Sequence, residues 1–270
     1  MAGKDSGASS GITDANAGGD GGPAWVDLYN GTDLTGFVVH SSPTHTTTPG
    51  TLLTGAAATA LFNPEPGMIH VYAAAADQST QPLALMETVA SYTKYNLMWD
   101  YKWGTKKFAP YTDFTAYPRD AGVLWAIHGD ITQIWPSSIE FQNKWGSAGD
   151  IFALYAQCKS LGSAGDSTTY APGGTAMTVN GSTGFVQHHR SANYELMASD
   201  AGNNGYGTDW NSCLLQVDNG AATYTVNGHV VNQVLAVMDK TGAPVTAGPV
   251  GWQAESSEVF YRNMRIQVFQ

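Results

Sequence analysis

The chain has 270 residues, of which 43% are apolar and 13% charged, and its 12 basic and 22 acidic residues give a formal net charge of −10. This balance excludes the basic patches that bind nucleic acids and anionic membranes, whereas a neutral partner such as a sugar is compatible with it. No apolar run approaches the roughly 20 residues that a transmembrane helix needs. We therefore expect one large globular domain with no nucleic-acid partner and no membrane span.

Residues 1–24 are rich in glycine, serine, alanine and aspartate and contain no hydrophobic signal core. This composition predicts a flexible tether over 1–24, followed by one folded domain over 25–270. We interpret Met1 as replacing an export signal that has been removed, because a loose tether before a β-domain is common in exported proteins. The protein is thus expected to be secreted or periplasmic, either free or tethered to the cell surface.

Short apolar segments with period-2 alternation follow one another along the rest of the chain, and no long helical pattern interrupts them. Residues 24–40 predict a strand, an Asn-Gly turn and a second strand, and a Thr/Pro/Ala-rich loop or embellishment follows over 40–67. Further strands are expected within 68–73, 95–104, 121–129, 137–142, 150–158, 176–181, 211–238 and 250–269. Strands at this spacing predict an all-β sandwich or jelly roll of two antiparallel sheets.

One carboxylate, Glu140, stands inside the apolar segment Ser-Ser-Ile-Glu-Phe-Gln at 137–142. Alternation places Ile139 and Phe141 on one face of this strand, and Glu140 and Gln142 on the other. The second face is either a solvent-exposed edge or a groove in which Glu140 takes part in chemistry, and the pattern alone leaves both open.

A second group of candidates lies in the stretch Tyr-Pro-Arg-Asp-Ala-Gly-Val-Leu-Trp-Ala-Ile-His-Gly-Asp at 117–130. Arg119 and Asp120 lie at a turn before a predicted strand, and His128 lies at its far end. If this strand neighbours that of Glu140, these side chains converge, and histidine and carboxylate are suited to proton transfer near neutral pH. The alternatives are a structural Arg-Asp pair and a strand histidine without a function.

Aromatic and basic residues are frequent along the predicted strand at 95–104 and just after it. In a curved sandwich the outward side chains of one sheet line a groove, and Trp99, Trp103 and Lys107 are candidates to line it. Aromatic rings suit the apolar faces of sugars, whereas core packing would explain the same rings without a ligand.

Several catalytic patterns are missing from the folded part of the sequence. A retaining glycosidase needs two carboxylates about 5 Å apart, usually from one strand on such a sandwich, and 137–142 offers only Glu140. Residues 25–270 also lack a Gly-x-Ser-x-Gly elbow, a Walker loop, a His-Glu-x-x-His pair and a Cys-x-x-Cys pair. Double-displacement glycosidase chemistry is therefore disfavoured.

The two cysteines, Cys158 and Cys213, both lie in apolar strand-like segments. A disulfide between them would agree with export, and two buried free thiols would give the same pattern. We take the disulfide as the expectation.

Eight segments of the chain, taken in order, resemble a bacterial family first catalogued as a domain of unknown function and now called 3-keto-disaccharide hydrolase, or 3-keto-glycoside hydrolase/lyase. The segments are WVDLYNGTDLTGF, YKWGTKKFAP, PRDAGVLWAIH, SSIEFQ, AGDIFAL, DWNSCLLQV, TVNGHVVNQV and GWQAESSEVFYRNMRIQ. The resemblance covers about 25–270 and implies a concanavalin-like jelly roll, exported by bacteria, that acts on sugars whose C3 hydroxyl has been oxidised to a ketone.

The resemblance also implies a reaction. A 3-keto group acidifies the C2 hydrogen, so a base removes it, the enolate expels the C1 substituent, and water then adds. The implied catalytic residues are Glu140, His128 and Asp120. The implied substrate-binding residues are Arg119, Gln142, Lys107, Trp99, Trp103 and Glu255. The resemblance leaves open whether a divalent metal ion is a cofactor, and it assigns no ligands to such an ion.

The sequence departs from the family pattern after Asp120. Where the family has a serine and, six residues after the aspartate, a histidine, this chain has Ala121 and Ala126. His128 lies two residues further on, and a shift of two residues keeps the same strand face, so we expect His128 to substitute. The alternative function is a non-catalytic carbohydrate-binding module or lectin, and a structural sandwich within a surface complex is a third.

Overall fold

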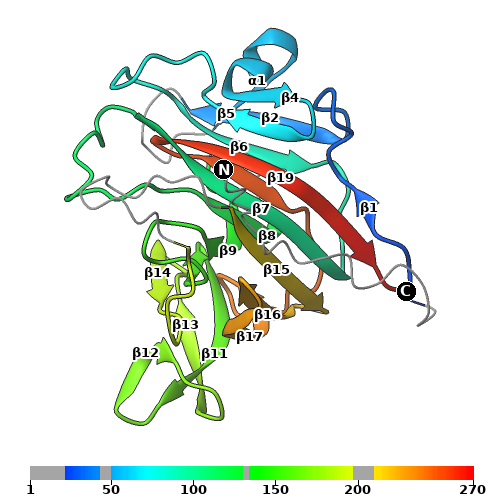
Figure 1. Ribbon diagram of the computed structural model, residues 1–270. Helices are drawn as coiled ribbons and strands as arrows, with labels where there is room; N and C mark the ends of the chain where they lie inside the picture. Colours follow the sequence, from blue (N-terminus) through cyan, green and yellow to red (C-terminus); the bar gives the residue numbers. More distant parts are fainter. Residues whose placement is uncertain (1–21, 43–49, 130–133, 197–209) are drawn as a thin grey trace, which may run out of the picture.

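The computed structural model describes residues 22–42, 50–129, 134–196 and 210–270. In these parts of the chain, the strands form two antiparallel sheets, of 11 and 8 strands, that pack face to face, and the one described helix is short (Figure 1). The predicted all-β jelly-roll sandwich is confirmed. No described helix combines the length and apolar character needed to cross a bilayer.

The larger sheet has the strand order β12-β11-β17-β16-β15-β7-β19-β5-β4, with β1 beside β19 and β13 beside β11. Its strands are β1 (Val26–Asp27), β4 (Phe62–Glu65), β5 (Met68–Val71), β7 (Lys94–Lys107), β11 (Ala156–Ser163), β12 (Asp166–Tyr170), β13 (Thr175–Asn180), β15 (Asn211–Asp218), β16 (Ala221–Val226), β17 (His229–Asp239) and β19 (Ser257–Val268). The long strands β7 and β19 lie side by side in the middle of Figure 1.

The smaller sheet has the strand order β14-β10-β9-β8-β18-β6-β2-β3. Its strands are β2 (Phe37–Ser42), β3 (Thr51–Leu53), β6 (Leu83–Thr88), β8 (Gly122–His128), β9 (Ser137–Gln142), β10 (Ile151–Leu154), β14 (Phe185–His188) and β18 (Gly251–Ala254). The helix α1 (Gly55–Leu61) connects β3 to β4, so part of the segment expected to be a loop or embellishment is regular structure.

The N-terminal segment turns where predicted but does not form a hairpin. Gly31 has a positive φ of 84°, and the side chain of Asn30 accepts hydrogen bonds from the backbone N–H groups of Thr32 and Asp33. After this turn the chain passes from one sheet to the other, because β1 pairs with β19 and β2 pairs with β6. The predicted tether lies outside the described residues as far as residue 21.

Two later Asn-Gly turns do form hairpins. Asn219 and Gly220 join β15 to β16, and Asn227 and Gly228 join β16 to β17; all four residues have positive φ. Two consecutive residues with positive φ match the twist of antiparallel strands, which is why Asn-Gly is favoured there.

The facing surfaces of the two sheets form one apolar core. Along β7, alternate residues from Tyr95 to Tyr101 point into it and are buried. The ring of Trp99 meets Phe141 of β9 edge to face, with 4.9 Å between the ring centroids. On β8, Trp125 donates a hydrogen bond from Nε1 to the Tyr224 hydroxyl at 2.6 Å, so its polar atom is paired inside the core.

The prediction of a disulfide between Cys158 and Cys213 is wrong. Cys158 and Cys213 are both buried free thiols. Cys158 lies on β11 and Cys213 on β15, with β17 and β16 between these strands in the sheet. Three strand spacings amount to about 14 Å, far beyond the roughly 4.4–6.8 Å between the Cα atoms of a disulfide. One argument for export is thereby removed.

We use the name outer face for the side of the smaller sheet that points away from the core. Strand pairing places Leu124 and Phe152 on it, and both belong to a small apolar cluster that is separate from the main core. Ile134 and Trp135, from the segment before β9, pack into the same cluster. Apolar side chains thus surround the polar groups on this face.

Candidate active site

Glu140 and Gln142 point from β9 to the outer face, as the alternation predicts. Their neighbours Ile139 and Phe141 are buried in the core between the sheets. Glu140 is itself only 4% exposed, and its Oε1 atom has no hydrogen-bond partner among the described residues. This oxygen is therefore an exception to the rule that buried polar atoms are hydrogen-bonded.

Two further carboxyl groups lie on the same patch of the outer face. Asp120, just before β8, is paired with Glu255, just after β18, in an isolated antiparallel bridge. On β8 the next outward position, Gly122, pairs with Gln142. Strand pairing therefore brings together Asp120, Glu140 and Glu255, which we call the acidic cluster.

The position of the Glu140 carboxyl depends on a glycine. A Cβ atom added to Gly122 would lie 1.9 Å from Oε1 of Glu140 and 2.6 Å from its Cδ. The carboxyl thus lies directly over the backbone of Gly122, in space that every other residue type would fill.

One cation contacts the acidic cluster closely. Lys144 Nζ lies 2.7 Å from Oδ2 of Asp120. Although burial works to lower it, the attraction of Asp120 raises the pKa of Lys144, so the ammonium group stays charged. Burial raises the pKa of Asp120, and Lys144 opposes that rise. Asp120 is therefore the member of the cluster that is best stabilised as a carboxylate.

The other two carboxyl groups retain their protons to higher pH. Burial, then the negative charges of Glu255 and Asp120, raise the pKa of Glu140 well above its usual value. Burial and the charge of Asp120 raise the pKa of Glu255 to about 8. The cluster therefore combines one carboxyl group paired with a cation and two that hold their protons more tightly, an arrangement suited to a base and acids within one patch.

Two predicted basic residues border the acidic cluster. Burial, followed by repulsion from Arg119, lowers the pKa of Lys107 to about 8, and Asp120 opposes this shift. The Lys107 Nζ also donates a hydrogen bond to the backbone oxygen of Tyr117. Arg119 is fully buried and its guanidinium group lies 4.5 Å from the ring centre of Phe114. The Arg119 guanidinium group also donates hydrogen bonds to the backbone oxygens of Lys106 and Thr105, at 3.0 and 3.1 Å, so it is held against the end of β7.

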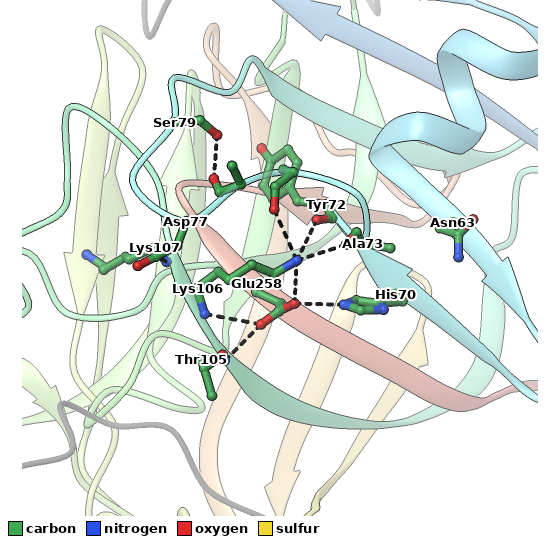
Figure 2. Close-up of polar contacts among 12 residues, drawn as sticks. Asn63, His70, Tyr72, Ala73, Asp77, Ser79, Thr105, Lys106, Lys107 and Glu258 are labelled. Carbon is green, nitrogen blue, oxygen red and sulfur yellow. Dashed lines mark hydrogen bonds and ion pairs between the residues drawn. The ribbon is translucent and has the colours of Figure 1, made fainter.

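A polar network at the end of β7 holds the backbone next to Lys107 (Figure 2). Glu258 of β19 accepts hydrogen bonds from the backbone N–H groups of Thr105 and Lys106, at 2.8 and 3.1 Å. The Lys106 Nζ and the His70 Nε2 each lie 2.9 Å from its Oε1. Burial works to raise the pKa of Glu258, but the bonds from His70 and Lys106 hold it at about 2. Glu258 therefore stays ionised and positions the strand end that carries Lys107.

The structure does not bring His128 to the acidic cluster. Ala126 has a positive φ of 50°, and the register of β8 against β9 shifts by one residue between Trp125 and His128. Because of this bulge, Ala126 joins the core and Ile127 joins the outer face. His128 pairs instead with Ser137, and its Nδ1 lies 2.8 Å from the backbone oxygen of Ala126.

The prediction that Trp99 and Trp103 line a sugar groove is wrong. Both rings belong to the core between the sheets, with exposed fractions of 0% and 5%. Side chains do alternate along β7, but Trp99 and Trp103 lie on the face of β7 that meets the smaller sheet. The outer face has its own tryptophan, Trp135, in the apolar cluster that includes Leu124.

Sequence reasoning also missed Lys144 as a member of this site. Continued alternation from Glu140 through Gln142 to residue 144 would have identified it, because equal parity places residues on one strand face. Just beyond the end of β9, the side-chain Oε1 of Gln142 accepts a hydrogen bond from the Lys144 backbone N–H at 2.8 Å, which holds Lys144 next to the strand.

Within the described ranges, no group of three or more His, Cys, Asp or Glu side chains is arranged to hold a metal ion. Lys144 already provides a positive charge to the acidic cluster.

A family model described as 3-keto-alpha-glucoside-1,2-lyase-like domain matches residues 24–267 of the chain. No curated protein sequence matches the chain.

Among solved structures, the fold is similar to that of a protein from Parabacteroides distasonis described as a "putative glycosyl hydrolase", with a TM-score of 0.51 and 15% identity over 91% of this chain and 94% of that one. A second structure from that organism with the same description has a TM-score of 0.49 and 14% identity, over 91% and 100% of the two chains. A carbohydrate-binding module from Bacillus subtilis has a TM-score of 0.40 and 6% identity, over 74% and 85%. At these identities the first structure supports the fold alone.

Proposed function

Because the chain belongs to the 3-keto-alpha-glucoside-1,2-lyase-like family, we propose that it cleaves the glycosidic bond of a 3-keto-glycoside by elimination across C1 and C2, followed by addition of water. The observation that carries this proposal is the acidic cluster, in which Asp120 is paired with Lys144 while the pKa values of Glu140 and Glu255 are raised. An elimination needs one base and at least one acid close to each other, and the cluster provides both.

In the first step Asp120 takes the proton from C2, and the C–H electron pair forms an enolate with the C3 carbonyl. A proton or hydrogen bond from Glu140 stabilises the charge that develops on the C3 oxygen. The enolate then reforms the ketone, a C1–C2 double bond forms, and the C1–O bond breaks. Glu255 gives its proton to the departing oxygen, since a carboxyl group with a pKa of about 8 is protonated at neutral pH.

In the second step water adds across the C1–C2 double bond. Its oxygen bonds to C1 and transfers a proton to Glu255, while Asp120 returns the proton to C2. The net reaction is hydrolysis, and both carboxyl groups regain their starting protonation. Lys144 keeps Asp120 ionised between turnovers.

The other predicted residues receive supporting roles. Gln142 points to the same face as Glu140 and is placed to bind a substrate hydroxyl. Lys107 and Arg119 provide positive charge at the border of the cluster. His128 has no part in this scheme, because the bulge in β8 directs it away from the outer face.

Release of the alcohol from a 3-keto-α-glucoside tests the proposal directly. The substitution Glu140→Gln replaces a neutral carboxyl group by an isosteric amide, so it preserves the fold and sugar binding, and turnover falls about 10² to 10⁴-fold. Asp120→Asn causes a loss of the same order. The exposed Asp218→Asn, on the larger sheet, is the control and retains activity.

Two results would contradict the proposal in different ways. If the wild-type protein binds 3-keto-α-glucosides but releases no alcohol, it is a carbohydrate-binding module. If Asp120→Asn keeps full activity, the protein is an enzyme but its base lies elsewhere.

Export is proposed separately, from the composition of the tether at residues 1–24. Mass spectrometry of the native protein checks it, because a protein that starts at an unprocessed Met1 has not lost a signal peptide.

A further inference from the structure

A second buried polar group lies on the outer face, away from the acidic cluster. His40 of β2 and Glu87 of β6 are 5% and 2% exposed, and His40 Nε2 lies 3.3 Å from Glu87 Oε1. Within the described residues, neither ring nitrogen of His40 makes a hydrogen bond of good geometry, and Oε2 of Glu87 has no partner. Buried polar atoms without partners are rare and call for an explanation.

Strand pairing shows that this group shares its face with Glu140. Glu87 pairs with Gly251 of β18, Gly251 pairs with Leu124 of β8, and Leu124 pairs with Glu140 of β9. Cross-strand pairs point to the same side of a sheet, so all four positions lie on the outer face. Three strand spacings, about 14 Å, separate the backbones of Glu87 and Glu140. The Glu140 carboxyl lies over Gly122 of β8, whereas the Glu87 carboxyl lies against His40 of β2, on the side of β6 away from β8.

An amide lies between the two groups. Gln253 of β18 pairs with Leu85 of β6, which in turn pairs with His40. Gln253 is 2% exposed, and its Oε1 has no partner among the described residues. The outer face thus holds unpaired acceptors on Glu87 and Gln253 and ring nitrogens of His40, beside the buried side chains of Leu85 and Leu124.

This combination matches the chemistry of a sugar ring. Each hydroxyl group both donates and accepts a hydrogen bond, so hydroxyls can donate to the Glu87 and Gln253 oxygens and accept from a His40 N–H. The missing partners of the buried atoms would then be supplied by the ligand.

We propose that His40, Glu87 and Gln253 form a second subsite, which binds the sugar that leaves as the alcohol when the glycosidic bond breaks. The separation from Glu140 is one that a disaccharide spans and a single ring does not. This inference rests on the proposed function, because it takes the oxidised ring to lie over the acidic cluster. Under this proposal the side chains of His40, Glu87 and Gln253 make the protein select a disaccharide over a glycoside of a small alcohol.

Kinetics with two substrates test the subsite. The probes are a 3-keto-α-glucosyl-glucose and methyl 3-keto-α-glucoside, which differ only in the leaving alcohol. For Glu87→Gln we expect kcat/KM for the disaccharide to fall at least tenfold and kcat/KM for the methyl glycoside to stay unchanged. Equal losses for both probes, or no loss for either, would overturn the proposal.

The larger sheet provides a matched control. Asp27 lies 2.8 Å from Arg265 in an ion pair between β1 and β19. Asp27→Asn should change neither substrate's kcat/KM, which separates a specific effect of Glu87→Gln from a general effect of removing a paired carboxylate.

Calorimetry gives a readout that does not depend on turnover. In the background of Glu140→Gln, the further change Gln253→Leu should weaken binding of the 3-keto-disaccharide at least tenfold and leave binding of the methyl glycoside unaltered. If the wild-type protein shows no turnover at all, this experiment still decides the subsite, so failure of the reaction and failure of the subsite remain distinguishable. Unaltered disaccharide binding in Gln253→Leu and in Glu87→Gln would refute it.

Discussion

Substituting Gly122 by alanine tests whether the position of the Glu140 carboxyl matters. The new methyl group would lie 1.9 Å from Oε1 of Glu140, whereas non-bonded atoms need about 3.5 Å, so the carboxyl must retreat by more than about 1.5 Å. The clash involves the end of a flexible side chain, and the φ of Gly122 is not positive, so the backbone accepts alanine. Alanine in a strand interior is favoured over glycine by roughly 0.5–1 kcal/mol, which offsets the cost of moving the carboxyl.

The expected result is an active-site defect without a folding defect. A displacement of about 1 Å at a reacting group costs on the order of 10²-fold in rate, so kcat for a 3-keto-α-glucoside should fall by about that factor in Gly122→Ala. Thermal unfolding should show a melting temperature close to that of the wild type. Gly165→Ala is the control, because nothing lies within 4 Å of its added Cβ and its φ is not positive.

A double-mutant cycle identifies the route of the effect. If Gly122 acts only by making room for Glu140, the double variant Gly122→Ala/Glu140→Gln loses no more activity than Glu140→Gln alone. Wild-type activity in Gly122→Ala would refute the reasoning, since the carboxyl cannot remain over the backbone once a methyl group is there.

Three further outcomes are expected. The kcat/KM of the wild-type protein should fall as pH rises through about 8, because Glu255, whose pKa is raised to that value, loses the proton that the leaving group needs. The variant Glu255→Gln should be slower overall and should not show this alkaline fall. If the variant shows the same fall, the fall belongs to another group. Titration of denatured, unreduced protein should find two thiols and titration of native protein none, because burial raises the pKa of Cys158 to about 12 and that of Cys213 well above its usual value. The pKa of Glu258, held at about 2, lies below that of an unfolded glutamate, so the contribution of Glu258 to stability is complete above about pH 4.5 and is lost between pH 4.5 and 2. The difference in melting temperature between the wild type and Glu258→Gln should therefore shrink over that range. A constant difference would contradict the assignment.

The sequence predicted much of this structure where local patterns decide it. Alternation in β9 placed Glu140 and Gln142 opposite the core side chains, and the Asn-Gly pair at 30–31 marked a turn. These features depend on neighbours in the chain, so a period of two residues and a turn preference are enough to find them.

Features that depend on partners far away in the sequence were not predictable in this way. Alternation separates the two faces of β7 but does not say which one meets the other sheet, so Trp99 and Trp103 were assigned to a groove when they lie in the core. The order of strands in the larger sheet keeps Cys158 and Cys213 apart, and nothing local to either cysteine reports that order. The pairing of Asp120 with Glu255, likewise, joins two segments more than a hundred residues apart.

The bulge in β8 has a consequence for how this chain can evolve. The family pattern has a histidine at the position of Ala126, yet here that position faces the core with a positive φ. A single codon change that installed histidine at 126 would bury an imidazole among apolar side chains rather than return it to the acidic cluster. Bringing a histidine at 126 to the outer face would need the substitution together with loss of one residue from the bulge. The bulge therefore makes two changes necessary where a regular strand would need one.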